Sequence, residues 1–140
     1  MLKTAPPFEN DDEIAALVKA FETCALSPDD FGHPAHLTVA LWYLKHSRMT
    51  EATRQMRDGL FRLLAHFGLE GYNETITVFW MRLLRGRIND STRSLAELVN
   101  EVVPACVEAK AIFAYYSRER LSSAEAKRAW VEPDLQPLDF

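Results

Sequence analysis

Apolar side chains recur along most of the chain at intervals of three and four residues, which is the spacing of one face of an α-helix. One such stripe covers residues 14–21 and predicts a first amphipathic helix that ends near residue 25. Another covers residues 52–67 and predicts a helix that begins near residue 50 and is stopped by Gly68, because glycine readily adopts the conformation that follows a helix. The pattern is that of an all-helical protein.

The segment from residue 34 to 46 is apolar on nearly all sides, so we expect a helix there to lie at the centre of the fold. Pro34 suits the first helical position, where the missing N–H needs no partner. Residues 74–84 are ambiguous, because the alternation at 76–80 is strand-like whereas the longer pattern also fits a helix. The length of the segment favours the helix.

The rest of the chain predicts helices at residues 95–103, 105–116 and 123–130, with Pro104 as a break or kink between the first two. Residues 89–91 predict a loop. Capping boxes, in which a small polar residue is followed three positions later by glutamate, mark the starts of three helices. They are Asn10 with Glu13, Ser94 with Glu97, and Ser122 with Glu125.

A chain of 140 residues, 48% hydrophobic and 26% charged, has the size and balance of one globular domain. We therefore expect residues 1–140 to form a single all-α domain, a bundle of six or seven helices in which the second and fourth are central. Residues 1–10 are expected to be flexible. Two prolines forbid a helix in residues 131–140, so we expect an extended C-terminal tail there.

The net charge of -4 offers a polyanion no general attraction, which argues against a nucleic-acid partner. No segment approaches the roughly 20 apolar residues that cross a bilayer, and no apolar signal-peptide core is present, so we expect no membrane partner. Cys24 and Cys106 are too few for a disulfide framework and predict free thiols in a cytoplasmic protein. The sequence leaves the oligomeric state undetermined.

Two histidines stand at the start of the apolar central segment, where a polar group that enters the core needs a partner. His33 and His36 are three residues apart, so on a helix they share a face and can chelate a divalent metal or bracket a substrate. If Pro34 is the first helical residue, however, His33 occupies the cap position and makes a capping hydrogen bond. A purely structural role for the two histidines stays open beside the ligand-binding one.

A second polar cluster lies inside an apolar run at residues 72–77. Glu74 is costly to bury unless it is paired, although the first turn of a helix also favours an exposed carboxylate. If it meets His36, the pair can act in general acid–base catalysis or form a structural hydrogen bond. The candidates for orienting a ligand are His33, Tyr43, Tyr72, Asn73 and Thr77.

Four short motifs run through the chain: F-G-H-P-A-H at 31–36, Y-N-E-T-I-T at 72–77, Y-Y-S at 115–117 and P-D-L-Q-P-L at 133–138. Together they resemble the pattern of an uncharacterised family of small, mostly bacterial, all-helical proteins without an assigned activity. That pattern usually has histidine where this chain has Asn73, and asparagine is a poor ligand for a transition metal. The resemblance implies one helical domain. Its motif positions are matched by His33, His36, Tyr72, Glu74 and Thr77.

Three functions follow as hypotheses. The first is a protein that binds a small polar ligand in a His/Glu/Tyr pocket, with His36 and Glu74 as the catalytic acid–base pair. The second is a mononuclear site in which His33, His36 and Glu74 hold a divalent metal. The third is a non-enzymatic interaction module in which the His/Glu cluster only stabilises the core.

Overall fold

The computed structural model describes residues 2–88, 93–106 and 108–140, so the predicted loop at 89–91 lies outside the described residues. Within these ranges the chain forms seven α-helices, one 3-10 helix and no strand, which confirms the all-α prediction and its helix count. The elements are α1 (Asp11–Glu22), α2 (His33–His46), α3 (Met49–His66), α4 (Glu74–Arg85), α5 (Leu95–Cys106), the 3-10 helix η1 (Ala109–Ala114), α6 (Arg118–Leu121) and α7 (Ala124–Arg128).

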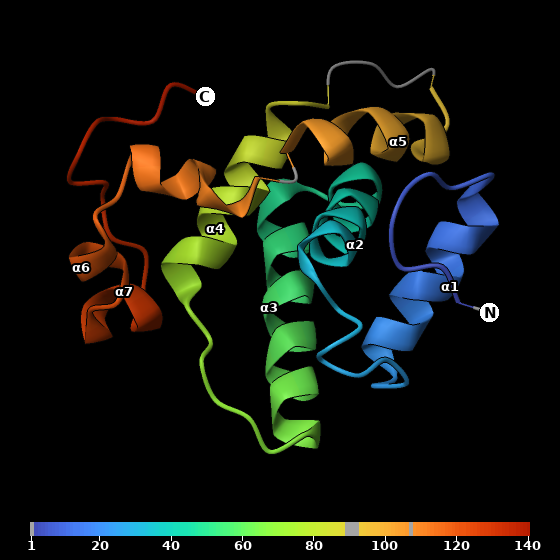
Figure 1. The fold of residues 1–140 in the computed structure, drawn as a ribbon, viewed down its shortest axis with the longest axis horizontal. Helices are drawn as coiled ribbons and strands as arrows, with labels where there is room; N and C mark the ends of the chain where they lie inside the picture. Colours follow the sequence, from blue (N-terminus) through green and yellow to red (C-terminus); the bar gives the residue numbers. More distant parts are fainter. Residues whose placement is uncertain (1, 89–92, 107) are drawn as a thin grey trace.

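Helix α2 lies at the centre of the bundle and packs against α1, α3, α4 and α5 (Figure 1). Eight of its 14 residues are buried, as expected for a helix that is apolar on nearly all sides. The buried hydroxyl of Thr38 donates a hydrogen bond to the carbonyl of Pro34 at 2.8 Å, so this polar group has a partner within its own helix. The central position predicted for this segment is confirmed.

The start of α2 differs from the prediction. Gly32 is the N-cap and offers no side-chain hydrogen bond, while His33 is already helical and Pro34 occupies the second position. The interpretation of His33 as a capping residue is therefore wrong. Because His33 and His36 both belong to the helix, they share a face as their spacing predicts.

Helices α1 and α3 approach each other closely at Gly59, a buried residue in the middle of α3. A Cβ atom at this position would lie 2.3 Å from the ring of Phe21 in α1. The same ring stacks on Phe31 with 4.8 Å between the ring centroids, so it has a neighbour on another side as well. Glycine at position 59 therefore allows the two helices to pack, although it lowers the helix propensity of α3.

The C-terminal third departs most from the sequence pattern. Helix α5 continues through Pro104 to Cys106, so the proline does not end the helix, and the predicted long helix at 105–116 is replaced by the short η1. Helix α6 was not predicted, and α7 is capped by Ser123 rather than Ser122. These short elements are held by tertiary hydrogen bonds, such as the one that the buried Tyr116 hydroxyl donates to the Val131 carbonyl at 2.6 Å.

The C-terminal residues that follow α7 contain no helix and are joined to the connection between η1 and α6. The Leu135 amide donates a hydrogen bond to the Tyr115 carbonyl at 2.9 Å. The amide and hydroxyl of Ser117 both donate to the carboxylate of Asp134, at 2.8 and 2.6 Å. The ring of Phe140 lies beside those of Phe79 and Tyr115, so the last residue reaches α4.

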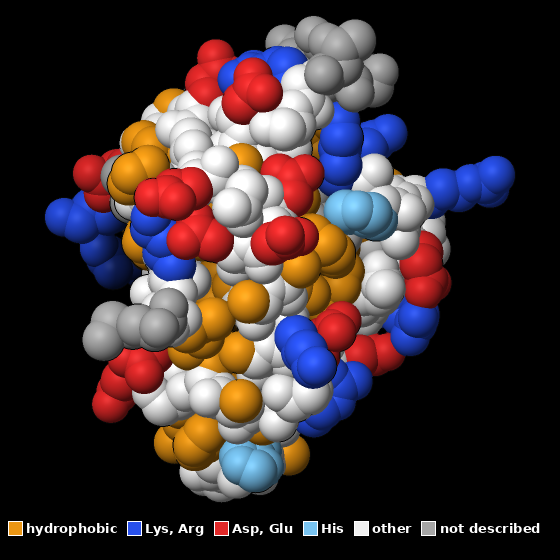
Figure 2. All heavy atoms as spheres, turned by 90° about the vertical axis from the view of Figure 1, so that its right-hand side faces the viewer, with side chains coloured by type: hydrophobic (Ala, Val, Ile, Leu, Met, Phe, Trp, Pro, Cys, Tyr) orange, Lys and Arg blue, Asp and Glu red, His pale blue; other side chains and the backbone are white. Residues whose placement is uncertain are grey.

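None of the helices in the described part of the chain has both the length and the apolar character needed to cross a membrane. On the face that Figure 2 shows, acidic and basic side chains are interspersed among apolar ones, so this face is not dominated by charge of one sign.

Candidate functional site

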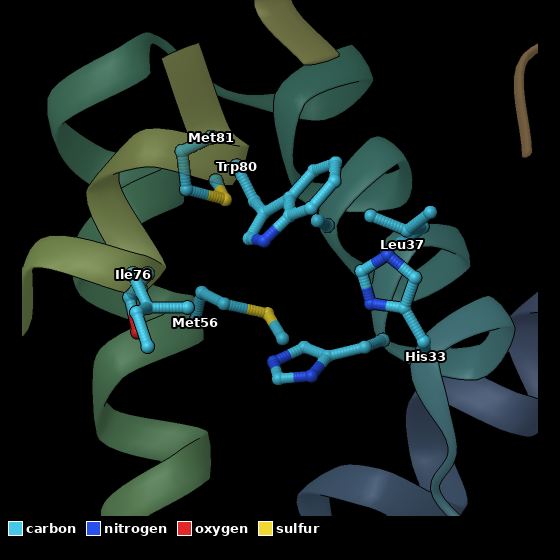
Figure 3. A pocket seen from close by; sticks show the side chains of 9 residues that line it. His33, Leu37, Met56, Ile76, Trp80 and Met81 are labelled. Atoms are coloured by element: carbon cyan, nitrogen blue, oxygen red, sulfur yellow. The ribbon is translucent and has the colours of Figure 1, made fainter. Parts of the chain in front are cut away.

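A largely enclosed cavity of about 80 Å³ lies between α2, α3 and α4 (Figure 3). Four of the residues that line it carry polar groups, namely His33, His36, Thr77 and Trp80, and the others are apolar. The residues of α2 and α4 that face it are spaced by about one helical turn, which places them on one side of each helix. The lining residues are His33, His36, Leu37, Ala40, Met56, Ile76, Thr77, Trp80 and Met81.

Both histidine side chains are partly buried and no carboxylate lines the cavity, so we expect both imidazoles to be neutral near pH 7. Burial lowers the pKa of His36 to about 4, and the neighbouring charge of His33, when present, lowers it as well. Burial also lowers the pKa of His33, against the opposing effect of a hydrogen bond with the backbone of Cys106. The site therefore offers hydrogen-bonding nitrogen atoms without charge.

The Nε2 atom of His33 is buried and has no hydrogen-bond partner among the described residues. An unsatisfied buried polar group of this kind costs about 1–3 kcal/mol, so proteins rarely leave one without a reason. The ring contacts Trp80 edge-on, with 4.7 Å between the ring centroids, while His36 lies 4.9 Å from Phe31. The two imidazoles are thus fixed by aromatic neighbours rather than by hydrogen bonds from other side chains.

Glu74 does not pair with His36 in this structure. Instead Arg57 of α3 donates two hydrogen bonds to its carboxylate, at 2.8 and 2.6 Å, and the Tyr72 hydroxyl donates a third. Burial raises the pKa of Glu74, but the hydrogen bonds from Arg57 and Tyr72 outweigh it and leave the pKa lowered. The predicted proton-transfer pair is not assembled, because an arginine on the neighbouring helix binds the carboxylate.

The predicted metal-binding set of His33, His36 and Glu74 is not assembled either. Within residues 2–88, 93–106 and 108–140, no three His, Cys, Asp or Glu side chains come together in a way that could hold a metal ion. Both carboxylate oxygens of Glu74 face Arg57 and line an open groove beside Phe61, outside the histidine cavity. This correction removes Glu74 from the candidate ligands.

Two other predicted ligand-binding residues are engaged in structural contacts. The Asn73 side chain caps α4 by accepting a hydrogen bond from the Ile76 amide at 3.0 Å, and it donates to the Leu121 carbonyl of α6 at 2.8 Å. The Tyr43 hydroxyl donates to Glu22 of α1 at 2.7 Å. Neither side chain lines the cavity, so neither contacts a ligand bound there.

Thr77 connects the cavity with the cluster around Glu74. It lines the cavity, and its hydroxyl donates a hydrogen bond to the Asn73 carbonyl at 3.1 Å. Tyr72 donates to Glu74 instead, and burial together with this carboxylate raises the pKa of Tyr72 to about 12. Of the polar residues in the predicted cluster at 72–77 that were named as site candidates, only Thr77 lines the cavity with the two histidines.

Four important side chains were not singled out from the sequence. Met56, Trp80 and Met81 lie on apolar helical stripes, where the pattern cannot distinguish a cavity wall from a filled core. Arg57 lies on the polar part of α3, and its partner is 17 residues further along the chain. The only indication in the sequence was that Glu74, if buried, needs a cation as its partner.

The chain was compared with known protein families, with curated proteins and with solved structures, and no match was found. The function is therefore argued from the chemistry of the cavity.

Proposed function

We propose that this protein binds a small ligand in the cavity between α2, α3 and α4, and that His33 and His36 hold it. The observation that carries the proposal is the buried Nε2 atom of His33, which lacks a hydrogen-bond partner beside an enclosed space. A ligand that binds this atom removes a penalty of about 1–3 kcal/mol. Mostly apolar walls with a few convergent polar groups are also typical of small-molecule sites.

The size and neutrality of the cavity limit the ligand. A volume of about 80 Å³ is roughly half that of an engineered cavity of about 150 Å³ that admits benzene, so a molecular ligand has only a few non-hydrogen atoms. No charged side chain lines the cavity, and a carboxylate or ammonium group would lose its hydration without gaining a counter-ion. A molecular ligand of this cavity is therefore compact and uncharged, and a metal ion fits only if neutral nitrogen and sulfur donors replace its hydration.

General acid–base catalysis near pH 7 is not included in the proposal. A group with a pKa of about 4 is a weak base, and efficient proton transfer needs a pKa closer to the working pH. The carboxylate that was expected to assist His36 is bound by Arg57. The two imidazoles are proposed to bind and orient a ligand.

Nuclear magnetic resonance of the two histidine rings tests the proposal, with pyrazole, ethanol and acetamide as neutral probes and acetate as the charged control. We expect at least one neutral probe to shift the His33 and His36 ring signals with saturation, while acetate does not. The variant His36→Gln should weaken this response at least tenfold, whereas His66→Gln, at an exposed position, should leave it unchanged. The proposal fails if neither a neutral probe nor a metal ion produces a saturable shift of these signals.

A non-enzymatic interaction module is a second candidate, supported by large apolar side chains at the end of α3 and in the following loop. Phe61, Phe67 and Leu69 are 49%, 39% and 48% exposed, and exposed apolar surface of this kind often marks a contact. The structural cluster of such a module would be Arg57, Glu74 and Tyr72. Glu74→Ala should then destabilise the fold while the neutral probes leave the histidine signals unshifted.

A further inference from the structure

We propose that the ligand of this cavity is a soft monovalent metal ion, Cu(I), coordinated by His33, His36 and Met56. This inference rests on the proposed function, because it names the ligand of the same cavity. Imidazole nitrogen and thioether sulfur are donors that suit copper, and thioether sulfur in particular favours Cu(I). Two histidines and two methionines line one space of about 80 Å³.

The arrangement of the helices brings these donors together. His33 and His36 are three residues apart on α2, a spacing that places their Cβ atoms about 5–6 Å apart on one face. Figure 3 shows Met56 extending its sulfur from α3 across the cavity toward α2, from which His33 points inward. Met81 lies on the same wall as Trp80 and supplies a second thioether to the cavity lining.

The absence of charge in the lining favours a monovalent ion over a divalent one. No carboxylate or thiolate lines the cavity, so nothing there compensates two positive charges. The cost of moving an ion into an apolar environment rises steeply with its charge, which disfavours zinc, and hard ions such as magnesium and calcium need oxygen ligands. Neutral imidazole and thioether groups do suit Cu(I).

Two further features support a soft cation. The ring of Trp80 lines the cavity, and an indole ring attracts a cation that lies over its face. The cavity is larger than one bare ion, but methionine has three rotatable side-chain bonds, so Met56 can adjust its sulfur toward a metal held by the histidines. The His33 Nε2 atom, which has no partner among the described residues, shows that this ring has free coordinating capacity.

Anaerobic titration with Cu(I) against a chromogenic chelator, and calorimetric titration with Ag(I) as a redox-stable substitute, test the proposal. Because thiolates also bind these ions, the measurements use a Cys24→Ala/Cys106→Ala background. We expect one metal ion per chain and partial quenching of the tryptophan fluorescence, because Trp80 is one of three tryptophans. Zinc should bind at least 100-fold more weakly.

Matched variants separate the cavity from the rest of the chain. Met56→Leu nearly preserves the side-chain volume and should weaken Cu(I) and Ag(I) binding at least tenfold. Met49 does not line the cavity, so Met49→Leu should have no effect on binding. His36→Gln should abolish stoichiometric binding, and the exposed His66→Gln should preserve it. Thermal unfolding of each variant without metal verifies that it folds.

The possible outcomes distinguish the two proposals. If neutral organic probes shift the histidine signals but neither metal ion binds, the copper proposal is overturned and the ligand-binding function stands. Metal binding that Met56→Leu leaves unchanged also overturns the proposed coordination. If neither the organic probes nor the metal ions reach the histidines, both proposals fail.

Discussion

Lowering the pH from 7 to 5 should destabilise this protein mainly through the protonation of His36. Its pKa is about 4 in the folded protein, because the buried ring loses hydration, against 6.5 in the unfolded chain. Between these values the unfolded state binds more protons, so stability is complete above about pH 6.5 and is lost as the pH falls toward 4. The direction is therefore loss of stability in mild acid.

The magnitude follows from the same two pKa values. The full difference between 6.5 and about 4 corresponds to roughly 3 kcal/mol, at about 1.4 kcal/mol for each pH unit. About 2 kcal/mol of this should already be lost at pH 5 relative to pH 7. His33 adds to the loss, because burial lowers its pKa too. Glu74 does not contribute in this range, since its lowered pKa costs stability only below about pH 4.5.

Urea unfolding at pH 7, 6 and 5 measures this effect, provided that the slope with urea concentration stays constant. His36→Gln should be less stable than the wild type at pH 7 and should lose about 2 kcal/mol less on acidification. His66→Gln is the matched control, because it removes an exposed histidine and should retain the wild-type pH dependence. A His36 ring signal that titrates near 6.5, or equal pH dependence in wild type and His36→Gln, would refute the reasoning.

Three substitutions test the packing around the site by chemical denaturation. Gly59→Ala should destabilise the protein by about 1–2 kcal/mol, because the clash of a Cβ atom 2.3 Å from the Phe21 ring costs more than the gain in helix propensity. An unchanged denaturation midpoint would contradict this prediction. Arg57→Gln and Glu74→Gln in a double-mutant cycle should show a coupling energy of about 1 kcal/mol, because the Arg57–Glu74 ion pair is partly buried and bidentate. Additive effects of the two substitutions would contradict this coupling. Thr75→Val should cost about 1–3 kcal/mol, because the buried Thr75 hydroxyl donates to the carbonyls of Ala126 and Ala129 and accepts a hydrogen bond from the Val131 amide. In this variant the Val131 amide should exchange its hydrogen faster, and an unchanged exchange rate would contradict the role of Thr75.

Part of the candidate site was predictable because it depends on positions within single helices. His33 and His36 share a face of α2 through their spacing, and Thr77, one of the candidates in the polar cluster at residues 72–77, lines the same cavity from α4. The partner of Glu74 was not predictable, because a carboxylate at a helix start can pair with any cation that the fold brings near it. The alignment of α3 with α4 brings Arg57 there.

The sequence by itself determined the major helices of this protein, because periodic apolar spacing, the Asn10 and Ser94 caps and the stop at Gly68 act within a few residues of the chain. Only the tertiary structure decided the short elements near the C-terminus, where long-range bonds such as that from Tyr116 to the Val131 carbonyl replace local preferences. It also decided that Met56 and Trp80 border a cavity. The spacing of apolar residues along a helix is the same whether the neighbouring helix packs tightly against them or leaves a space.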